Sequence, residues 1–326
     1  MSPDAADQLE AMAERSSRLT RHHFGNTMSL YTPLYLSNYC SGGCSYCGFA
    51  SDRSYKRHRL EKDELCSELE ALKQKGIQDI LLLTGERTDA ADFDYLLEMV
   101  RISAEHIHNV SVEAFAMTEA EYAELINAGC TGVTLYQETY VPERYADLHR
   151  WGEKTDYEYR VMAAERALSA GMRTFGMGVL LGLSDPLEDM MYLFRHIRYV
   201  QKKFWKTGVQ VSFPRICKQE GGYEPEFEIT DRMLAQYIFA FRICLPDAHL
   251  VLSTRESCSF RDGMAGMGNS RMRVGSRKSA GGDQGETQDP AKKFYGKDAR
   301  AVLEYFKMWK NQTPHQALMN RGNRAQ

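Results

Sequence analysis

Residues 33–49 read PLYLSNYCSGGCSYCGF, an apolar, strand-like run that leads directly into three closely spaced cysteines. Cys40, Cys44 and Cys47 are therefore expected on a loop just after the carboxyl end of the first strand. In a barrel of parallel strands, active sites are built from the loops at that end. Three thiolates can hold three irons of a [4Fe–4S] cluster and leave the fourth iron open to an external ligand. The stretch predicts such a cluster at the mouth of an α/β barrel.

The cysteine spacing also admits a zinc site. A zinc knuckle takes four protein ligands, usually with a second Cys/His pair at a set distance. His58 offers a fourth ligand, but it lies beyond a loop that is crowded with Gly42, Gly43 and Gly48. We therefore favour the iron–sulfur cluster. Tyr46, directly before the last cysteine, is well placed to lie against an adenine ring.

Short β-rich runs alternate with longer amphipathic runs along the chain, which is the pattern of a parallel sheet covered by helices. The predicted strands are residues 34–38, 79–84, 111–115, 132–137, 174–181, 209–213, 249–254 and 272–276. Helical periodicity marks residues 62–75, 90–106, 119–128, 157–170, 187–203 and 231–243. The pattern predicts a (β/α)8 TIM-type barrel over residues 31–282, after an N-terminal helical extension (residues 1–30) and before a loop and C-terminal helix (residues 283–326).

The expected helix ends agree with this periodicity. Thr118 is followed by Glu121 three residues later, a pair that predicts a capping box at the start of a helix. Gly76, Gly129 and Gly171 each follow a helical run, where a left-handed residue commonly ends a helix. Capping residues and hydrophobic pattern thus predict the same boundaries.

Composition limits the class of protein. With 326 residues and 43% hydrophobic content, the chain is long enough for one large α/β domain. A formal net charge of −3 argues against a nucleic-acid partner, and no apolar run reaches the ~18 residues that span a membrane. The remaining cysteines are scattered, so we predict idle thiols in a reducing, cytoplasmic compartment: Cys66, Cys130, Cys217, Cys244 and Cys258.

The pattern CxxxCxΦC, with Φ aromatic, resembles the signature of the radical S-adenosylmethionine (SAM) superfamily. Further segments, FGNTMSLYTPLYLSNYC, SYCGF, LLLTGE, LYQETY, GVLLGLSD, VSFPR and LVLSTRE, are similar in order and spacing to the aromatic amino-acid lyases of that superfamily. This similarity runs from about residue 19 to residue 282. The resemblance implies a biotin-synthase-like barrel and a [4Fe–4S] cluster whose open iron binds the amino and carboxylate groups of SAM.

In this family a hydrogen is taken from L-tyrosine and the Cα–Cβ bond breaks, giving 2-iminoacetate (dehydroglycine) and p-cresol, with 5′-deoxyadenosine and methionine formed from SAM. The phrases SFPR and GGYEP favour the branch that supplies the thiazole ring of thiamine. The resemblance therefore implies a carbon–carbon lyase acting on L-tyrosine. It also implies a thiazole synthase as partner and an electron donor of the flavodoxin or ferredoxin type.

One alternative is disfavoured and two stay open. The tyrosine lyase that matures [FeFe]-hydrogenase adds a C-terminal domain with a second cysteine-bound cluster, whereas no cysteine follows Cys258 in this sequence. The tryptophan lyase of indolic-acid biosynthesis shares the core and differs in its substrate pocket. The non-enzymatic alternative is a metal-binding scaffold in thiazole assembly.

The resemblance also implies a set of SAM-binding residues. Glu86, after the second predicted strand, is expected near the amino end of SAM, where a carboxylate attracts the positively charged ligand. Glu138 and Arg160 resemble the pair that holds the polar groups of SAM in biotin-synthase-like barrels, since a guanidinium can grip a carboxylate with two hydrogen bonds. Gly176 and Gly178 are expected to let the backbone approach the adenosine.

Candidate substrate residues follow the sixth and seventh predicted strands. An α-carboxylate bound in a barrel mouth needs a fixed cation and a hydroxyl or amide donor. Arg255 with Ser253 is our candidate for that carboxylate, with Arg215 as a second or alternate partner. An Arg255–Glu256 clamp at the barrel end is the structural alternative. No residue in the sequence identifies itself as the group that orients the substrate amine.

Overall fold

A computed structural model describes residues 1, 3–217 and 222–275 of the chain. In this part, eight parallel strands pair in chain order and close into a barrel. The strands are β1 (Ser29–Tyr35), β2 (Asp79–Leu83), β3 (Asn109–Glu113), β4 (Cys130–Thr134), β5 (Thr174–Gly178), β6 (Gly208–Ser212), β7 (His249–Leu252) and β8 (Arg271–Arg273). The predicted (β/α)8 fold is confirmed.

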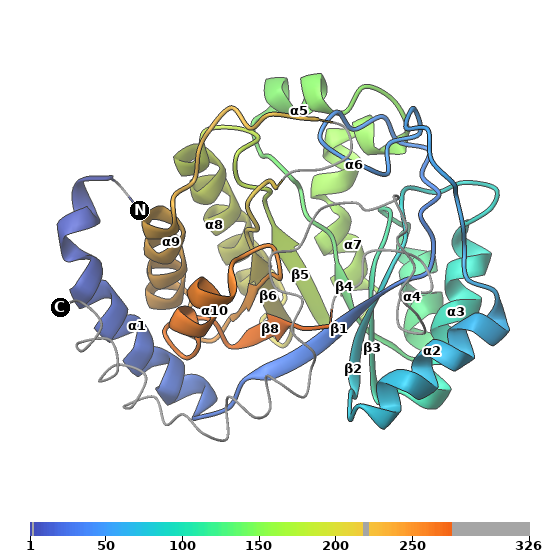
Figure 1. Cartoon of the computed structure of the whole chain (residues 1–326), viewed down its shortest axis with the longest axis horizontal. Coiled ribbons are helices and arrows are strands. Elements are labelled where there is room, and N and C mark those ends of the chain that lie inside the picture. Colours follow the sequence, from blue (N-terminus) through green and yellow to red (C-terminus); the bar gives the residue numbers. More distant parts are fainter. Residues whose placement is uncertain (2, 218–221, 276–326) are drawn as a thin grey trace.

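Helices surround the barrel, with α5 and α6 above its mouth at the top of Figure 1. In chain order they are η1 (Pro3–Gln8), α1 (Leu9–Phe24), α2 (Lys62–Gln74), α3 (Phe93–His106), α4 (Glu119–Asn127), α5 (Pro142–Leu148), η2 (Glu153–Thr155), α6 (Tyr157–Val161), α7 (Ala163–Ser169), α8 (Pro186–Lys203), α9 (Asp231–Cys244) and α10 (Cys258–Met264). The helix predicted at residues 157–170 is two short helices that meet at Met162. The short helices α5 and α10 were not predicted.

The strands are buried on both faces, which is why they read as nearly continuous apolar runs. In β2, Ile80 and Leu82 belong to the core between the sheet and the helices. Leu81 and Leu83 alternate with them and pack inside the barrel with a second cluster that includes Cys44. Full burial of each such leucine or isoleucine contributes about 1.5–3 kcal/mol. The cysteine loop therefore rests on a packed barrel interior.

The predicted helix ends are confirmed. The Thr118 hydroxyl accepts a hydrogen bond from the Glu121 N–H at 3.2 Å, and the Glu121 carboxylate accepts one from the Thr118 N–H at 2.8 Å. Gly76, Gly129 and Gly171 all have positive φ, and the value of 102° at Gly129 lies in a region that a Cβ disfavours. These caps fix where the chain leaves each helix and turns into the next strand.

The N-terminal extension is helical, as predicted, and α1 packs along α9 (Figure 1). The Ser16 hydroxyl donates to the Met267 carbonyl at 2.6 Å, and the Phe24 ring lies 4.9 Å from the His249 ring at the start of β7. The predicted boundary at residue 30 falls inside β1, which begins at Ser29. The predicted C-terminal loop and helix (residues 283–326) lie outside the described residues. In the described part, no helix is both long and apolar enough to cross a membrane.

Candidate active site

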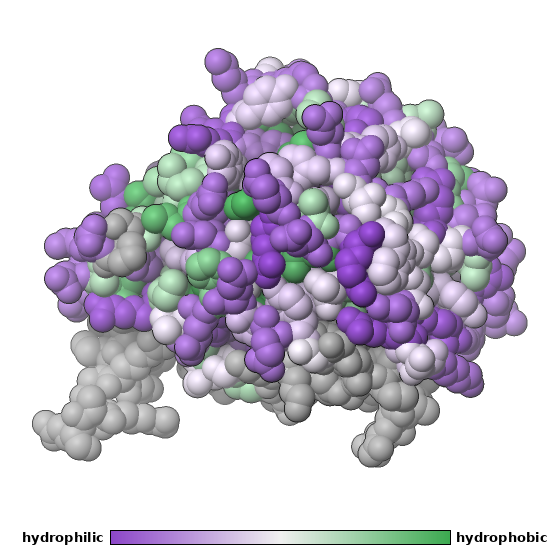
Figure 2. Space-filling view, turned by 90° about the horizontal axis from the view of Figure 1, so that it is seen from above, coloured by the Kyte–Doolittle hydropathy of each residue, from purple (hydrophilic) through white to green (hydrophobic). Residues whose placement is uncertain are grey.

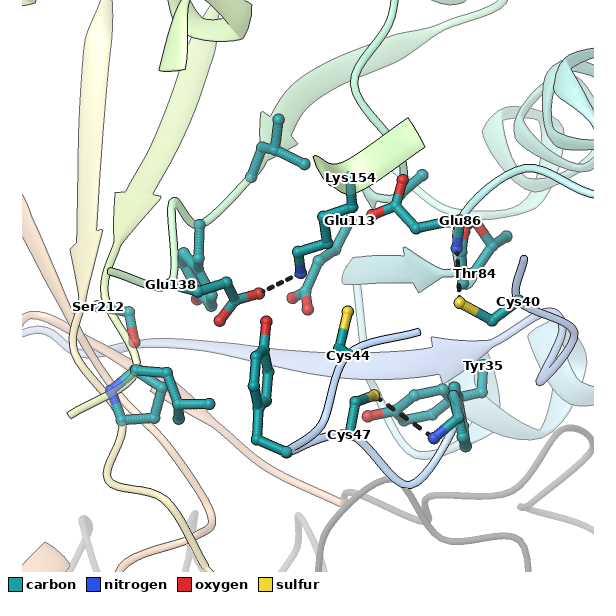
Figure 3. A pocket seen from close by; sticks show the side chains of 18 of the residues that line it. Tyr35, Cys40, Cys44, Cys47, Thr84, Glu86, Glu113, Glu138, Lys154 and Ser212 are labelled. Carbon is teal, nitrogen blue, oxygen red and sulfur yellow. Dashed lines mark hydrogen bonds and ion pairs between the residues drawn. The ribbon is translucent and has the colours of Figure 1, made fainter. Parts of the chain in front are cut away.

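Three cysteine side chains line one cavity at the carboxyl end of the strands. Figure 3 shows the sulfur atoms of Cys40, Cys44 and Cys47 pointing into this space from the loop after β1. Burial raises the pKa of the Cys44 thiol to about 12, although the ammonium of Lys154 acts in the opposite direction. A thiolate at this position therefore needs further positive charge nearby, such as a bound iron supplies.

Backbone N–H groups already point at two of these sulfurs. The N–H groups of Gly42 and Glu86 donate to the Cys40 sulfur at 3.4 and 3.3 Å, and the Phe49 N–H donates to the Cys47 sulfur at 3.4 Å. Hydrogen bonds of this kind stabilise charge on a thiolate and tune the potential of iron–sulfur clusters. The donor set thus fits a cysteine-bound cluster.

The same residues fit a single zinc ion poorly. In the described ranges, no group of three or more His, Cys, Asp or Glu side chains could hold one metal ion. A cubane differs, because each thiolate binds a separate iron. His58 contacts Glu64 at 3.3 Å, and its half-exposed ring does not line the cavity. The proposed fourth zinc ligand is therefore engaged elsewhere.

The cysteine loop is held by the last residue of α5 and the segment that follows it. The N–H groups of Gly43 and Ser45 donate to the carbonyls of Trp151 and Leu148 at 3.0 and 2.9 Å, and the Arg150 Nε donates back to the Gly43 carbonyl at 2.9 Å. The Trp151 ring lies so close to Gly43 that a Cβ there would meet it at 2.3 Å. Only glycine allows this contact, which holds the loop against the barrel.

A network of four charged side chains lines the same cavity as the sulfurs, and Figure 3 shows three of them, Glu86, Glu138 and Lys154. Arg160 contacts Glu86 at 3.2 Å and Glu138 at 3.9 Å, and its Nε donates to the Tyr136 carbonyl at 2.9 Å. Lys154 donates to Glu138 at 2.7 Å. The structure thus brings together Glu86, Glu138 and Arg160, as predicted.

Lys154 was missed by sequence reasoning. It stands in the polar stretch WGEKTDY, which is typical of an exposed turn, yet the residue is 9% exposed. Burial and Arg160 lower its pKa, but Glu138, Cys44 and Glu86 outweigh them and hold the pKa above its usual value. The ammonium is therefore a permanent cation beside the cysteines. No local pattern marks it, because its position depends on the short turn η2.

Comparison with known proteins agrees with this geometry. A model of the radical SAM superfamily matches residues 34–195, and a model of the biotin and thiamin synthesis associated domain matches residues 212–317. The chain is 38% identical over 283 residues to the 2-iminoacetate synthase of Escherichia coli (strain K12), covering 86% of this chain and 75% of that protein. The chain belongs to the radical SAM superfamily. Membership implies a [4Fe–4S] cluster and SAM.

Two solved structures have a similar architecture. The [FeFe]-hydrogenase maturase HydG from Carboxydothermus hydrogenoformans is 30% identical, with a TM-score of 0.86 over 93% of this chain and 70% of that one. Methylornithine synthase (PylB) is 21% identical, with a TM-score of 0.76 over 98% of this chain and 93% of that one, and supports the fold alone.

Two further features of this radical SAM protein lie next to the cysteines. Tyr46 lines the cavity, and its hydroxyl pairs with the Nε2 of His149 at 2.8 Å. Burial lowers the pKa of His149 to about 3, so the ring is neutral and holds Tyr46 without adding charge. Glu138 has a φ of 72°, which is rare for a residue with a side chain, and such strain concentrates at functional sites.

Gly176 and Gly178 have a different role from the one predicted. A Cβ at Gly176 would meet the Thr134 side chain at 2.6 Å, and one at Gly178 would meet the Ser212 carbonyl at 2.1 Å. Neither glycine lines the cavity that contains the cysteines. Close packing inside the radical SAM barrel, and not an approach to adenosine, accounts for both.

The predicted substrate residues separate into two groups. Ser253 and Arg255 line the cavity, and the Arg255 guanidinium donates to the Arg215 carbonyl at 3.2 Å. Arg215 does not line it: its side chain forms ion pairs with Glu256 and, at 2.8 Å, with Asp231. The clamp at the barrel end is therefore made by Arg215 with Glu256, and the prediction that Arg215 contacts substrate is not supported by its position.

Asp189 of α8 holds the chain next to Glu138. One of its carboxylate oxygens accepts hydrogen bonds from the Thr139 hydroxyl at 2.9 Å and the Tyr140 N–H at 2.7 Å. The other oxygen is buried and has no hydrogen-bond partner among the described residues. Burial raises the pKa of this carboxyl to about 7, against the lowering effect of its hydrogen bonds.

This raised pKa predicts a pH-dependent stability. Between the unfolded pKa of about 4 and the folded pKa of about 7, the folded state binds more protons, so its free energy of unfolding falls as pH rises. Asparagine at this position cannot ionise. As the pH rises from about 5 to about 8, we therefore expect the free energy of unfolding of Asp189→Asn to increase by about 1–3 kcal/mol relative to that of the wild type. Urea unfolding at both pH values measures this, and an equal difference at the two would contradict it.

Proposed function

We propose that this chain is a radical SAM lyase that cleaves the Cα–Cβ bond of L-tyrosine to 2-iminoacetate and p-cresol, in the branch that supplies the thiazole of thiamine. The observation that carries the proposal is the 38% identity to 2-iminoacetate synthase over 86% of this chain. The match to the biotin and thiamin synthesis associated domain supports the same branch.

The cavity residues support this chemistry through distinct roles. Cys40, Cys44 and Cys47 would hold the cluster, which together with SAM supplies the one-electron chemistry that removes a hydrogen atom from the substrate. Glu86 and Glu138, balanced by their buried cations, would attract the polar groups of SAM. The ion pairs hold these charges in place before SAM binds, which lowers the cost of reorganisation.

Arg255 with Ser253 would bind the α-carboxylate of tyrosine, since both residues follow β7 and line the cavity. Apolar and aromatic residues, including Leu135, Leu180 and Tyr136, offer the surface against which an aromatic side chain packs. A thiazole synthase partner and a flavodoxin- or ferredoxin-type donor remain part of the proposal.

An anaerobic assay of the reconstituted, reduced protein tests the proposal, with tyrosine and tryptophan supplied side by side. We expect p-cresol and 5′-deoxyadenosine to form in tyrosine-dependent amounts. A product from tryptophan and none from tyrosine would overturn the choice of substrate. Zinc without labile sulfide in the reconstituted protein would favour the scaffold alternative.

A further inference from the structure

Glu113 is a third carboxylate in the cavity, at the carboxyl end of β3 (Figure 3). The other two acids there are engaged, because Glu86 pairs with Arg160 and Glu138 pairs with Lys154. In the part of the chain that the structure describes, no cation or hydrogen-bond donor contacts the Glu113 carboxylate. Its position inside the barrel, half-buried, sets it apart from a solvated surface acid.

Cationic side chains face Glu113 from the other side of the barrel. In the strand order of the closed barrel, β3 lies opposite β7, whose end carries Arg255, and β8 follows with Arg273 as its last residue. Both arginines line the same cavity as Glu113. The Arg273 Nη2 donates to the Tyr35 hydroxyl at 3.3 Å, and its buried Nε has no hydrogen-bond partner among the described residues.

This arrangement leaves an anion and a cationic wall facing each other without an ion pair between them. Arg273 acts on the Glu113 carboxylate through space and without an ion pair, so the carboxylate keeps the capacity to bind a further cation. An α-amino acid carries an ammonium and a carboxylate on the same carbon, so its head group can satisfy both sides at once. Glu86 and Glu138 are paired with Arg160 and Lys154 and are already assigned to SAM, which leaves Glu113 as the carboxylate available to the substrate amine.

We propose that Glu113 binds the α-amino group of the amino-acid substrate. The inference rests on the proposed function in that it takes the substrate to be an amino acid. The phenol hydroxyl of tyrosine is the competing partner for this carboxylate. A neutral phenol donates one hydrogen bond and brings no charge to the half-buried carboxylate, whereas an ammonium pairs with it as an ion, which favours the amine.

Equilibrium binding to the anaerobically reconstituted protein, loaded with SAM, tests the proposal. The probes are L-tyrosine, 3-(4-hydroxyphenyl)propionate, which lacks the amine, and L-phenylalanine, which lacks the phenol hydroxyl. We expect Glu113→Gln to weaken tyrosine and phenylalanine by about 30-fold or more, and to leave 3-(4-hydroxyphenyl)propionate within about threefold of wild type. Retained binding of that deaminated probe also shows that the variant is folded.

Glu124→Gln is the matched control, because Glu124 is exposed on α4 and does not line the cavity. We expect it to change no affinity. Equal losses for tyrosine and 3-(4-hydroxyphenyl)propionate, with phenylalanine unchanged, would assign Glu113 to the phenol and overturn the proposal. Unchanged affinity for all three probes in Glu113→Gln would overturn it as well.

The proposed function can fail separately from this inference. If the wild-type protein binds L-tryptophan and not L-tyrosine, the tyrosine assignment is wrong, and L-tryptophan with indole-3-propionate replaces the probe pair. A selective loss of tryptophan binding in Glu113→Gln would then still support the amine contact. Binding of neither amino acid to the wild-type protein would overturn both proposals.

Discussion

Replacing Cys44 by alanine is expected to abolish the visible absorbance of the cluster and all SAM cleavage. Two thiolates rarely retain a cubane of this kind, and Cys44 lies next to the segment that holds the cysteine loop, where it forms a β-bridge with His149. The expected result is a colourless protein after anaerobic reconstitution. Iron and sulfide analysis, the absorbance spectrum and the yield of 5′-deoxyadenosine measure it.

Cys66→Ala provides the control for Cys44→Ala. Cys66 is a free, half-buried cysteine on α2 and does not line the cavity, so its loss should leave the iron content and SAM cleavage unchanged. SAM cleavage by Cys44→Ala at the wild-type rate would contradict the assignment of the three ligands.

Arg160→Met should have the second-largest effect. The arginine is 6% exposed and contacts the carboxylates of Glu86 and Glu138, and its removal deprives Glu86 of the cation that pairs with it among the described residues. Breaking a buried ion pair from one side typically costs about 3–5 kcal/mol of stability. We expect a loss of that size in urea unfolding and a fall in SAM affinity of at least about 100-fold.

Arg166→Met is a control with the same chemical change in the next helix. Arg166 donates to the carbonyls of Met117 and Tyr159 and does not line the cavity. It should lose some stability and keep its affinity for SAM. Wild-type SAM affinity in a folded Arg160→Met protein would show that the guanidinium does not contribute to the SAM site.

Most of the fold could be predicted because it follows from local patterns. All eight predicted strands are present. Each is a short apolar run bounded by turn residues, and this pattern in a sequence is typical of a buried strand. The first strand was placed late, at residues 34–38 in place of Ser29–Tyr35, because its start is polar and contains Pro33. Helix α5 has only seven residues, too few for a periodic signal.

The site was only partly predictable, because contacts between distant segments decide it. The cysteine spacing is local and indicated the cluster loop, while Lys154 and Glu113 acquire their surroundings from β-strands and turns far away in the sequence. Arg215 lies just after β6 and would suit a substrate ligand by position. It turns instead to Glu256, which a sequence cannot reveal because the partner follows another strand.

The face above the barrel mouth is mainly hydrophilic in the view of Figure 2, so its polar residues should tolerate many substitutions. Glu138 differs, because its left-handed backbone costs about 1–3 kcal/mol that glycine would avoid. Glycine would also leave the buried Lys154 without its carboxylate partner, which costs about 3–5 kcal/mol and exceeds the strain that is relieved. In a library of random variants, selection for thermal stability should therefore keep glutamate at position 138 together with its left-handed backbone.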